Sequence, residues 1–255
     1  CFERFGFAGG RLVIAACGSW IVACGLWGGG GGGSLLSPTR PCPLRRPVVG
    51  SHRFDPNTPS EETADALESI YRSGKALYIG ISSYSANKTK AMIKILKNRN
   101  IKLFIHQPSY SLINRWIEKD LTKTLIENGV GCIAFSPLAQ GFLSDKYLNG
   151  IPKGTRVSEN SSFSKDLITK NNLKIINNLN SIAKKRGQSL SQMALAWVLN
   201  NKAVTSALIG VRTLTQLQDN LAALNNLKFS KDELKSIDKK AKEGKINLWA
   251  PSSSY

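Results

Sequence analysis

The sequence predicts an α/β fold of the parallel β/α-barrel type, as a partial barrel of about five β/α units followed by a C-terminal helix. First, short apolar segments alternate with amphipathic segments of helical period from Val48 to Leu224. Second, the segment Ala76–Ile81 is apolar on both faces, as a strand in a parallel sheet covered by helices must be. Third, polar residues follow the predicted strands, at the carboxyl ends where such barrels carry catalytic and ligand groups. These residues are Ser51, His52, Arg53, Ser82, Ser83, His106, Gln107 and Ser136.

The five predicted strands are short and mostly apolar, and a turn or a helix cap follows each of them. Cys132 lies inside the fourth, where its apolar neighbours indicate a small buried hydrophobic residue. The strands are Val48–His52, Ala76–Ile81, Leu103–Ile105, Val130–Phe135 and Val204–Ile209.

The first helix shows the clearest start and stop signals. Thr58 is a suitable N-cap, Pro59 suits the first helical position, and Glu61 completes a capping box. Gly74 is expected to end this helix, because glycine adopts the left-handed C-terminal cap conformation most easily.

The later helices follow the same rules, and three of them begin at a capping residue. Ser85 caps one, Ser189 forms a capping box with Gln192, and Thr213 forms another with Gln216. A long excursion through 150–154 is expected to lie over the barrel mouth. The helices after the first are a helix beginning at Ser85, Trp116–Glu127, about 170–186, Leu190–Leu199, a helix beginning at Thr213, and Lys231–Glu243, the last packed across the outside.

Residues 1–50 differ in composition from the rest, and are predicted to be an unrelated, disordered or artefactual head before a domain at 51–255. A mostly apolar run at 12–27 is followed by six glycines at 28–33, which behave as a flexible linker. The run is marginal for a membrane span, which needs about 20 apolar residues, yet a secretory or anchoring role stays open. Four of the five cysteines lie in this head without the spacing of a metal site, and no metal is predicted.

The formal charge of +18 comes from 35 Lys and Arg residues against 17 Asp and Glu residues. The lysines are scattered over predicted helix faces and are not interleaved with aromatic residues, so a solvated surface explains them. No dedicated nucleic-acid partner is expected. A single buried thiol in the body suits a reducing, cytoplasmic compartment.

Five stretches in order resemble the aldo-keto reductase family, over residues 51–255. They are SHRFDPNTP (51–59), GKALYIGISSYS (74–85), IHQPSYSLINRW (105–116), GVGCIAFSPLAQGFLSDKYLNGIP (129–152), and NNLKFSKDEL (225–234) with KINLW (245–249). The resemblance implies a (β/α)8 TIM barrel that reduces small aldehydes or ketones with NADPH, possible substrates being glyceraldehyde 3-phosphate or methylglyoxal. It also allows an NADPH-binding regulatory subunit associated with a channel, or a non-functional fragment. A homo-oligomer stays open.

The resemblance also implies roles for individual residues. His52 matches the histidine that orients the substrate carbonyl in the family. Ser82, Ser83 and Gln107 match the residues that hold the nicotinamide carboxamide, and Phe135 matches the aromatic residue that stacks on the nicotinamide ring. The positions along the pyrophosphate are Ser136, Leu138, Gln140 and Gly141, and those at the adenosine end are Gly210, Arg212, Gln216, Asp219 and Asn220.

The same resemblance places an aspartate, a tyrosine and a lysine of the catalytic set on the first three β/α units of the family. The head contains no tyrosine, no lysine and no aspartate. The expectation is therefore a truncated, catalytically incomplete reductase that keeps most cofactor contacts, with two open sheet edges.

Overall fold

The computed structural model describes residues 12–16, 23–24, 46–148 and 169–241. Its sheet contains seven strands, all parallel, in the order β1-β7-β6-β5-β4-β3-β2. The strands are β1 Leu12–Ala16, β2 Ala23–Cys24, β3 Arg46–Ser51, β4 Ala76–Ser82, β5 Leu103–Gln107, β6 Gly131–Phe135 and β7 Val204–Val211. Strands β3 to β7 are the five predicted ones, each within two residues of its predicted bounds.

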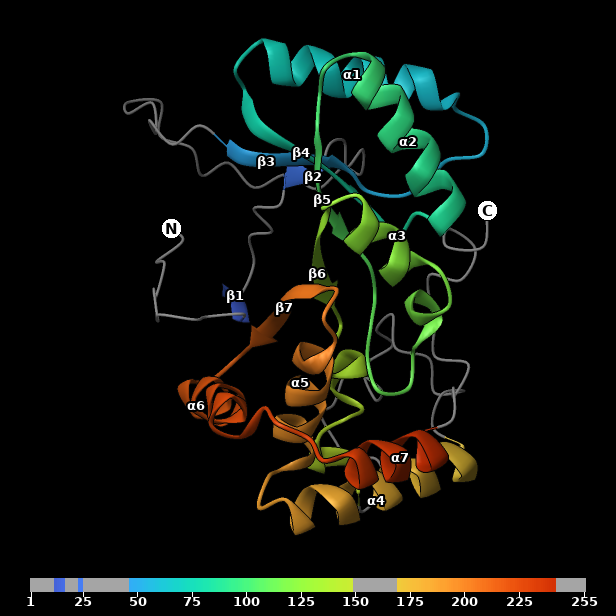
Figure 1. Ribbon diagram of the computed structural model, residues 1–255. Coiled ribbons are helices and arrows are strands. Elements are labelled where there is room, and N and C mark those ends of the chain that lie inside the picture. Colours follow the sequence, from blue (N-terminus) through green and yellow to red (C-terminus); the bar gives the residue numbers. More distant parts are fainter. Residues whose placement is uncertain (1–11, 17–22, 25–45, 149–168, 242–255) are drawn as a thin grey trace, which may run out of the picture.

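The helices follow the strands in alternation and cover the outer face of the sheet. Figure 1 shows α1 and α2 beside β3 and β4, and α5 beside β7, with α4 and α7 further out. The strand direction also changes across the sheet, from β3 lying across the view to β6 running down its middle. The helices are α1 Ser60–Arg72, α2 Ala86–Asn98, α3 Leu121–Glu127, α4 Lys170–Lys185, α5 Leu190–Asn200, α6 Leu214–Ala222 and α7 Lys231–Lys240.

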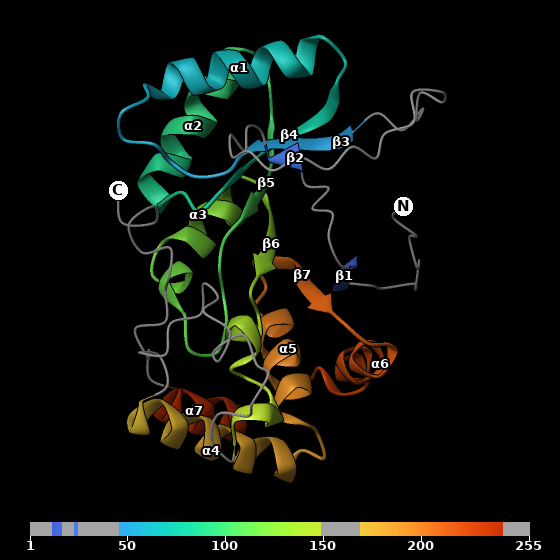
Figure 2. The ribbon, with the colours of Figure 1, turned by 180° about the vertical axis from the view of Figure 1, so that it is seen from behind.

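The two edge strands come from residues before 46, where no strand was predicted. β1 pairs with β7 from Leu12↔Ala207 to Ala16↔Val211, and β2 pairs with β3 through Ala23↔Val49 and Cys24↔Gly50. Both views place β1 next to β7 and β2 next to β3 (Figures 1 and 2). The two edges of the sheet therefore lie one strand further out than expected, at β1 and β2, because the outer N–H and C=O groups of β3 and β7 pair with extended backbone from the same chain.

Several helix ends differ from their predicted caps. α1 begins at Ser60 with Pro59 at the N-cap, one residue later than predicted, and proline has no side-chain oxygen to cap the helix; the Thr58 hydroxyl donates to Asp55 Oδ2 (2.7 Å). The predicted helix 116–127 is divided into a 3₁₀ turn at Trp116–Glu118 and α3. The final helix ends at Lys240, and the loop 150–154 lies outside the described residues.

Other caps are confirmed. Ser85 accepts from the Lys88 N–H, and the capping box of Ser189 with Gln192 is present at α5. At α6, Thr213 accepts from the Gln216 N–H, but the Gln216 side chain turns to the Arg212 N–H, so only half of that box forms. Gly74 ends α1 with φ +68°, as predicted.

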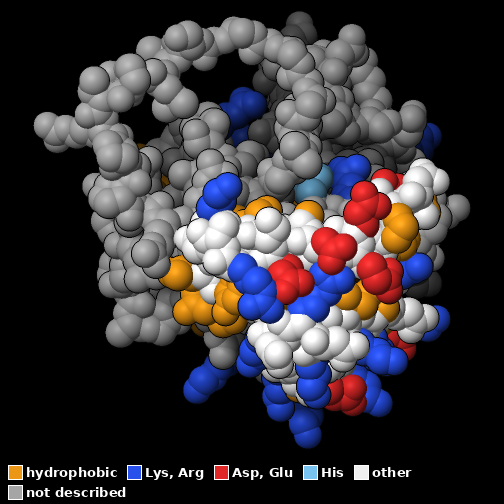
Figure 3. Space-filling model, turned by 90° about the horizontal axis from the view of Figure 1, so that it is seen from above, with side chains coloured by type: hydrophobic (Ala, Val, Ile, Leu, Met, Phe, Trp, Pro, Cys, Tyr) orange, Lys and Arg blue, Asp and Glu red, His pale blue; other side chains and the backbone are white. Residues whose placement is uncertain are grey.

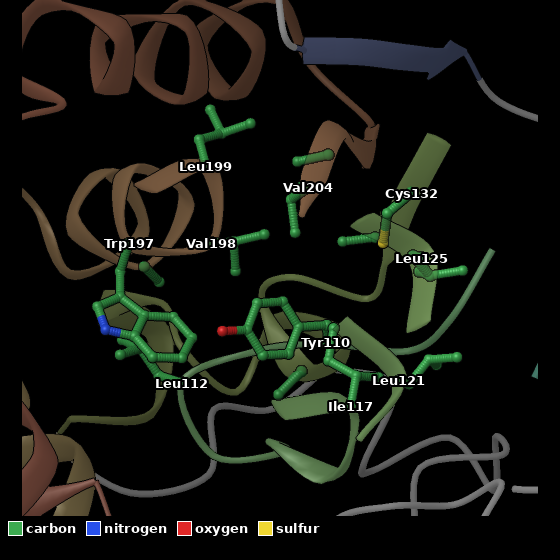
Figure 4. Packing of buried hydrophobic residues seen from close by; sticks show 14 of the residues in the cluster. Tyr110, Leu112, Ile117, Leu121, Leu125, Cys132, Trp197, Val198, Leu199 and Val204 are labelled. Atoms are coloured by element: carbon green, nitrogen blue, oxygen red, sulfur yellow. The ribbon is translucent and has the colours of Figure 1, made fainter. Parts of the chain in front are cut away.

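A single large core lies between the sheet and the helices, and Figure 4 shows the part under α5 and α3. Tyr110 packs against Trp197 there, with ring centroids 5.2 Å apart, and its hydroxyl donates to Glu118 Oε1 (2.7 Å). Cys132 is fully buried in this core, as predicted, and burial raises the pKa of its thiol to about 12. The thiol is therefore inert at neutral pH.

Charges of both signs intermix on the helical face seen from above in Figure 3. Arg99 at the end of α2 forms ion pairs with Asp65 and Glu68 of α1, and Glu68 also pairs with Arg72. The two pairs of Arg99 join α2 to α1, whereas the pair of Glu68 with Arg72 lies within α1. No helix among the described residues is long and apolar enough to cross a membrane.

Candidate active site

The predicted site residues lie at the carboxyl ends of neighbouring strands. β3, β4, β5, β6 and β7 are adjacent in the sheet and parallel, so their carboxyl ends form one edge. His52 follows β3, Ser82 ends β4 and Gln107 ends β5. Phe135 ends β6, and Gly210 lies near the end of β7. The fold therefore gathers these residues, as a site on a parallel barrel requires.

Hydrogen bonds join Ser82, Ser83 and Gln107 directly. The Ser82 hydroxyl donates to the Gln107 backbone carbonyl (2.7 Å), and the Ser83 N–H donates to the same oxygen (3.2 Å). All three residues are buried. The Gln107 Nε2 atom is also buried, and it has no hydrogen-bond partner among the described residues. A buried amide donor without an acceptor is costly, by about 1–3 kcal/mol, and it suits a ligand carbonyl.

Phe135 is fixed to the segment that follows Gln107. Its N–H donates to the Pro108 carbonyl (2.9 Å), and its own carbonyl accepts from the Tyr110 N–H (3.1 Å). The side chain is half-buried. The backbone thus holds the Phe135 ring at the end of β6, beside the end of β5 where Gln107 lies.

Left-handed backbone is concentrated at this edge. Five non-glycine residues among those described have positive φ, and four of them follow β4 or β6. Such conformations cost of order 1–3 kcal/mol each and tend to cluster at functional sites. The four are Ser83 (φ 57°), Ser136 (φ 54°), Ala139 (φ 48°) and Gln140 (φ 59°).

The segment after β6 reaches the end of β7. Leu138 packs against a small buried cluster of Ile209 of β7, Leu195 of α5 and Ala223, and Val211 of β7 packs against the same cluster. Gly141 has φ +97°, and a Cβ built there would meet no atom within 4 Å, so the backbone is accessible at that point. The residues predicted along a pyrophosphate therefore connect the β6 end to the β7 end.

The predicted adenosine-end residues lie on β7, on the loop after it and on α6. Arg212 is exposed, and its N–H donates to Gln216 Oε1 (2.9 Å). Asn220 is buried at 5% exposure, whereas Asp219 is half-buried and accepts from Gln192 Nε2 (2.7 Å). The link to Gln192 was not predicted, because the two residues lie 27 positions apart and nothing local signals it.

His52 lies at the neighbouring strand end, beside a hydrogen bond that the sequence did not predict. The preceding residue, Ser51, shares a hydrogen bond with the Tyr84 hydroxyl (3.0 Å). Partial burial and the charge of Arg53 lower the pKa of His52 below its usual 6.5, so its ring is neutral at pH 7. Burial raises the pKa of Tyr84, which keeps that hydroxyl protonated.

Within the described parts of the chain, no three His, Cys, Asp or Glu side chains gather where they could hold a metal ion. The groups at this edge are backbone amides, short hydroxyls, side-chain amides, one aromatic ring and one histidine. These groups can hold a planar amide and an anionic chain, and they can polarise a carbonyl.

A model of the Aldo/keto reductase family matches residues 48–242, which is most of this chain. The protein thus belongs to the aldo-keto reductases, a family of oxidoreductases built on the (β/α)8 barrel.

Among known proteins, the chain is 45% identical to an L-glyceraldehyde 3-phosphate reductase of Escherichia coli K12, over 98% of this chain and 76% of that protein. It is 35% identical to a putative voltage-gated potassium channel subunit beta of Schizosaccharomyces pombe, over 75% of this chain and 58% of that one. An uncharacterized oxidoreductase of Bacillus subtilis is also 35% identical, over 73% of this chain and 56% of its own length. The first alignment extends into residues 1–47, which the family model does not match.

Proposed function

We propose that this protein binds NADPH along the edge formed by the carboxyl ends of β4 to β7. Its reaction would be the reduction of small aldehydes or ketones, such as glyceraldehyde 3-phosphate or methylglyoxal. The observation that carries the proposal is the buried Gln107 Nε2 donor, which has no partner in the described part of the chain and lies next to Ser82 and Ser83 at the same edge. The 45% identity to an L-glyceraldehyde 3-phosphate reductase supports this substrate class.

The residues present fit a nicotinamide dinucleotide. Gln107 Nε2 would donate to the carboxamide oxygen, and the Ser82 and Ser83 hydroxyls lie beside it. Phe135 offers a ring for stacking at the next strand end. The bound cofactor would supply the hydride.

Further along the edge, the protein offers groups suited to the phosphates. Leu138 (φ −97°, ψ 15°) followed by the left-handed Ala139 (φ 48°) has the right-handed then left-handed backbone that forms anion-binding nests. Arg212 lies just before the N-terminus of α6, where both its charge and the helix dipole favour a phosphate.

His52 would act on the substrate carbonyl. Because its pKa is lowered, the neutral ring keeps one N–H that can donate to a carbonyl oxygen as negative charge develops there. It would orient and polarise that oxygen. The proton that completes reduction requires a separate donor of the kind that the family places on tyrosine.

A titration with NADPH and NADH tests the cofactor assignment. We expect NADPH to bind more tightly, and Arg212→Gln to weaken NADPH by about 10- to 100-fold while leaving NADH unchanged, since one charge-assisted contact is lost. Lys202→Gln is a matched control, because Lys202 is an exposed cation before β7, at the opposite end of the strand. Equal loss for both cofactors, or no loss for NADPH, would contradict the assignment.

A second candidate is a cofactor-binding regulatory subunit, which the 35% identity to a potassium channel subunit beta favours. This class needs NADPH binding but little turnover. Capture of a membrane channel by the purified chain, with NADPH bound and no aldehyde reduction, would favour the second candidate. We expect a cytoplasmic protein under either one.

A further inference from the structure

One side-chain amide connects the start of α5 to the middle of α6. Gln192 Oε1 accepts from the Ser189 N–H (3.1 Å) and completes the capping box of α5. The Nε2 atom of the same amide donates to Asp219 Oδ1 of α6 (2.7 Å). A single amide thus satisfies a helix cap with its oxygen and a carboxylate of the next helix with its nitrogen.

The Asp219 carboxylate has a second contact at the same helix end. The Ser189 hydroxyl lies 3.5 Å and 3.4 Å from its two oxygens, which makes a weak contact beside the short one from Gln192. A carboxylate at the N-terminus of α5 is also favoured by the helix dipole. The carboxylate therefore has a defined position relative to α5.

This link matters for the position of α6, because little of the surface of that helix is buried. The helix has nine residues, and Asn220 is the only one of them that is buried. A helix with so small a buried face gains little from hydrophobic packing, so polar contacts set its position to an unusual degree. Asp219 and Asn220 are adjacent on α6, and Gln216 is one turn earlier.

We propose that Gln192 is a positioning residue for the adenosine end of the cofactor. It acts through Asp219, by fixing α6 and the loop that carries Arg212 relative to the β7 edge. This inference rests on the proposed NADPH site. It assigns to Gln192 a role that its helix-capping function alone does not require.

The test uses the full chain and exchanges donor and acceptor. Gln192→Glu keeps the oxygen that caps Ser189 but places a carboxylate against Asp219. The double variant Gln192→Glu with Asp219→Asn restores the pair, since the asparagine amide can donate to the new carboxylate and keep its own oxygen free. Glu233→Gln is the matched control, because Glu233 occupies the same capping-box position in α7 and is paired with Arg186 instead.

Three ligands are titrated by fluorescence or calorimetry, namely NADPH, adenosine 2′,5′-bisphosphate and reduced nicotinamide mononucleotide. We expect Gln192→Glu to weaken the two adenosine-containing ligands by about tenfold, the worth of one hydrogen bond to a charged group. Reduced nicotinamide mononucleotide, which lacks adenosine, should bind as before. The double variant should recover most of the loss, and Glu233→Gln should change no ligand selectively.

Other outcomes overturn the inference in distinguishable ways. Equal weakening of all three ligands, together with a lower melting temperature, means that Gln192 is only structural. Unchanged affinity in Gln192→Glu means that the link does not position the site. If the unaltered chain binds neither NADPH nor adenosine 2′,5′-bisphosphate, the proposed function fails, and the inference fails with it.

Discussion

Gln107 and His106 are neighbours at the end of β5, and each has a buried nitrogen without a hydrogen-bond partner among the described residues. His106 is fully buried, and its Nε2 lies 3.1 Å from the Tyr84 carbonyl, which requires that this nitrogen carry the proton. The two residues therefore show different uses of an unpaired polar atom. Gln107 is proposed to donate to a ligand, whereas the ring of His106 must stay neutral because a charged ring in the core would destabilise the fold.

Replacing Gln107 with Met should separate binding from stability. Because the Nε2 donor has no partner among the described residues, its loss should leave the free energy of unfolding unchanged or raise it. NADPH should bind about tenfold more weakly. The control is Gln188→Met, since Gln188 uses both amide atoms, with Arg186 and the Asn226 carbonyl, and should lose about 1–3 kcal/mol of stability. Unchanged NADPH affinity in Gln107→Met would exclude a ligand contact at this amide.

His106 should make the protein sensitive to acid. Burial lowers its pKa from 6.5 to about 4 in the folded state, so below pH 6.5 the unfolded chain binds more protons. The stability contributed by the neutral ring is fully present above pH 6.5 and is lost as the pH falls towards 4, by up to about 3 kcal/mol. Urea unfolding at pH 7.5, 5.5 and 4.5 should show a shallower pH slope for His106→Gln. Equal slopes for the two proteins would contradict this assignment.

At the level of elements, the central strands were predictable and the contacts between distant elements were not. Strands β4 to β7 are short apolar runs between capped helices, and this alternation predicts both their type and their order along the chain. β1 and β2 were missed because an edge strand of two to five residues needs only backbone pairing, which leaves no side-chain pattern. The predicted α1 cap was one residue too early, because the helix begins at Ser60 with Pro59 at the N-cap.

For the candidate site too, some features could be predicted from the sequence and others could not. Its strand-end residues were predictable because each directly follows an apolar run, and the structure brings them to one edge. Whether they face one groove stays a prediction. The left-handed backbone at Ser83 and Ser136 and the bond between Gln192 and Asp219 depend on packing that sequence spacing does not encode.

The pairing of β3 with β4 requires a glycine at position 50. A Cβ built on Gly50 would lie 2.6 Å from the Gly80 carbonyl oxygen, and a backbone atom cannot move away as a flexible side chain can. Gly50→Ala should therefore destabilise the protein by about 1–3 kcal/mol, the usual cost of overpacking. Gly210→Ala is the control, because nothing lies within 4 Å of a Cβ built there. Similar chemical denaturation midpoints for the two variants would refute the argument.

At the scale of the whole molecule, binding of the cofactor and turnover of a substrate can be measured separately. A polypeptide of these 255 residues should bind NADPH but reduce glyceraldehyde 3-phosphate or methylglyoxal very slowly. The reason is that its first fifty residues hold no tyrosine or lysine to supply and tune the proton. Loss of a general acid lowers rates by about 10²–10⁴-fold. A steady-state assay decides, and turnover of order 1–10³ s⁻¹ would show that another residue donates the proton.

The pairing of β1 with β7 has a consequence for the order in which the protein forms. Leu12 and Ala207 are partners 195 positions apart, so β1 can pair only after the much later β7 has been synthesised. Closing so long a loop is slow relative to local β/α pairing, and we expect β1 to dock after β4 to β6 have assembled. Pulsed hydrogen exchange during refolding should protect the amides of 79–81 and 105–107 before those of 12–16, and simultaneous protection would rule out this order. Until then, the side of β7 that pairs with β1 has free backbone N–H and C=O groups, which could pair with another chain.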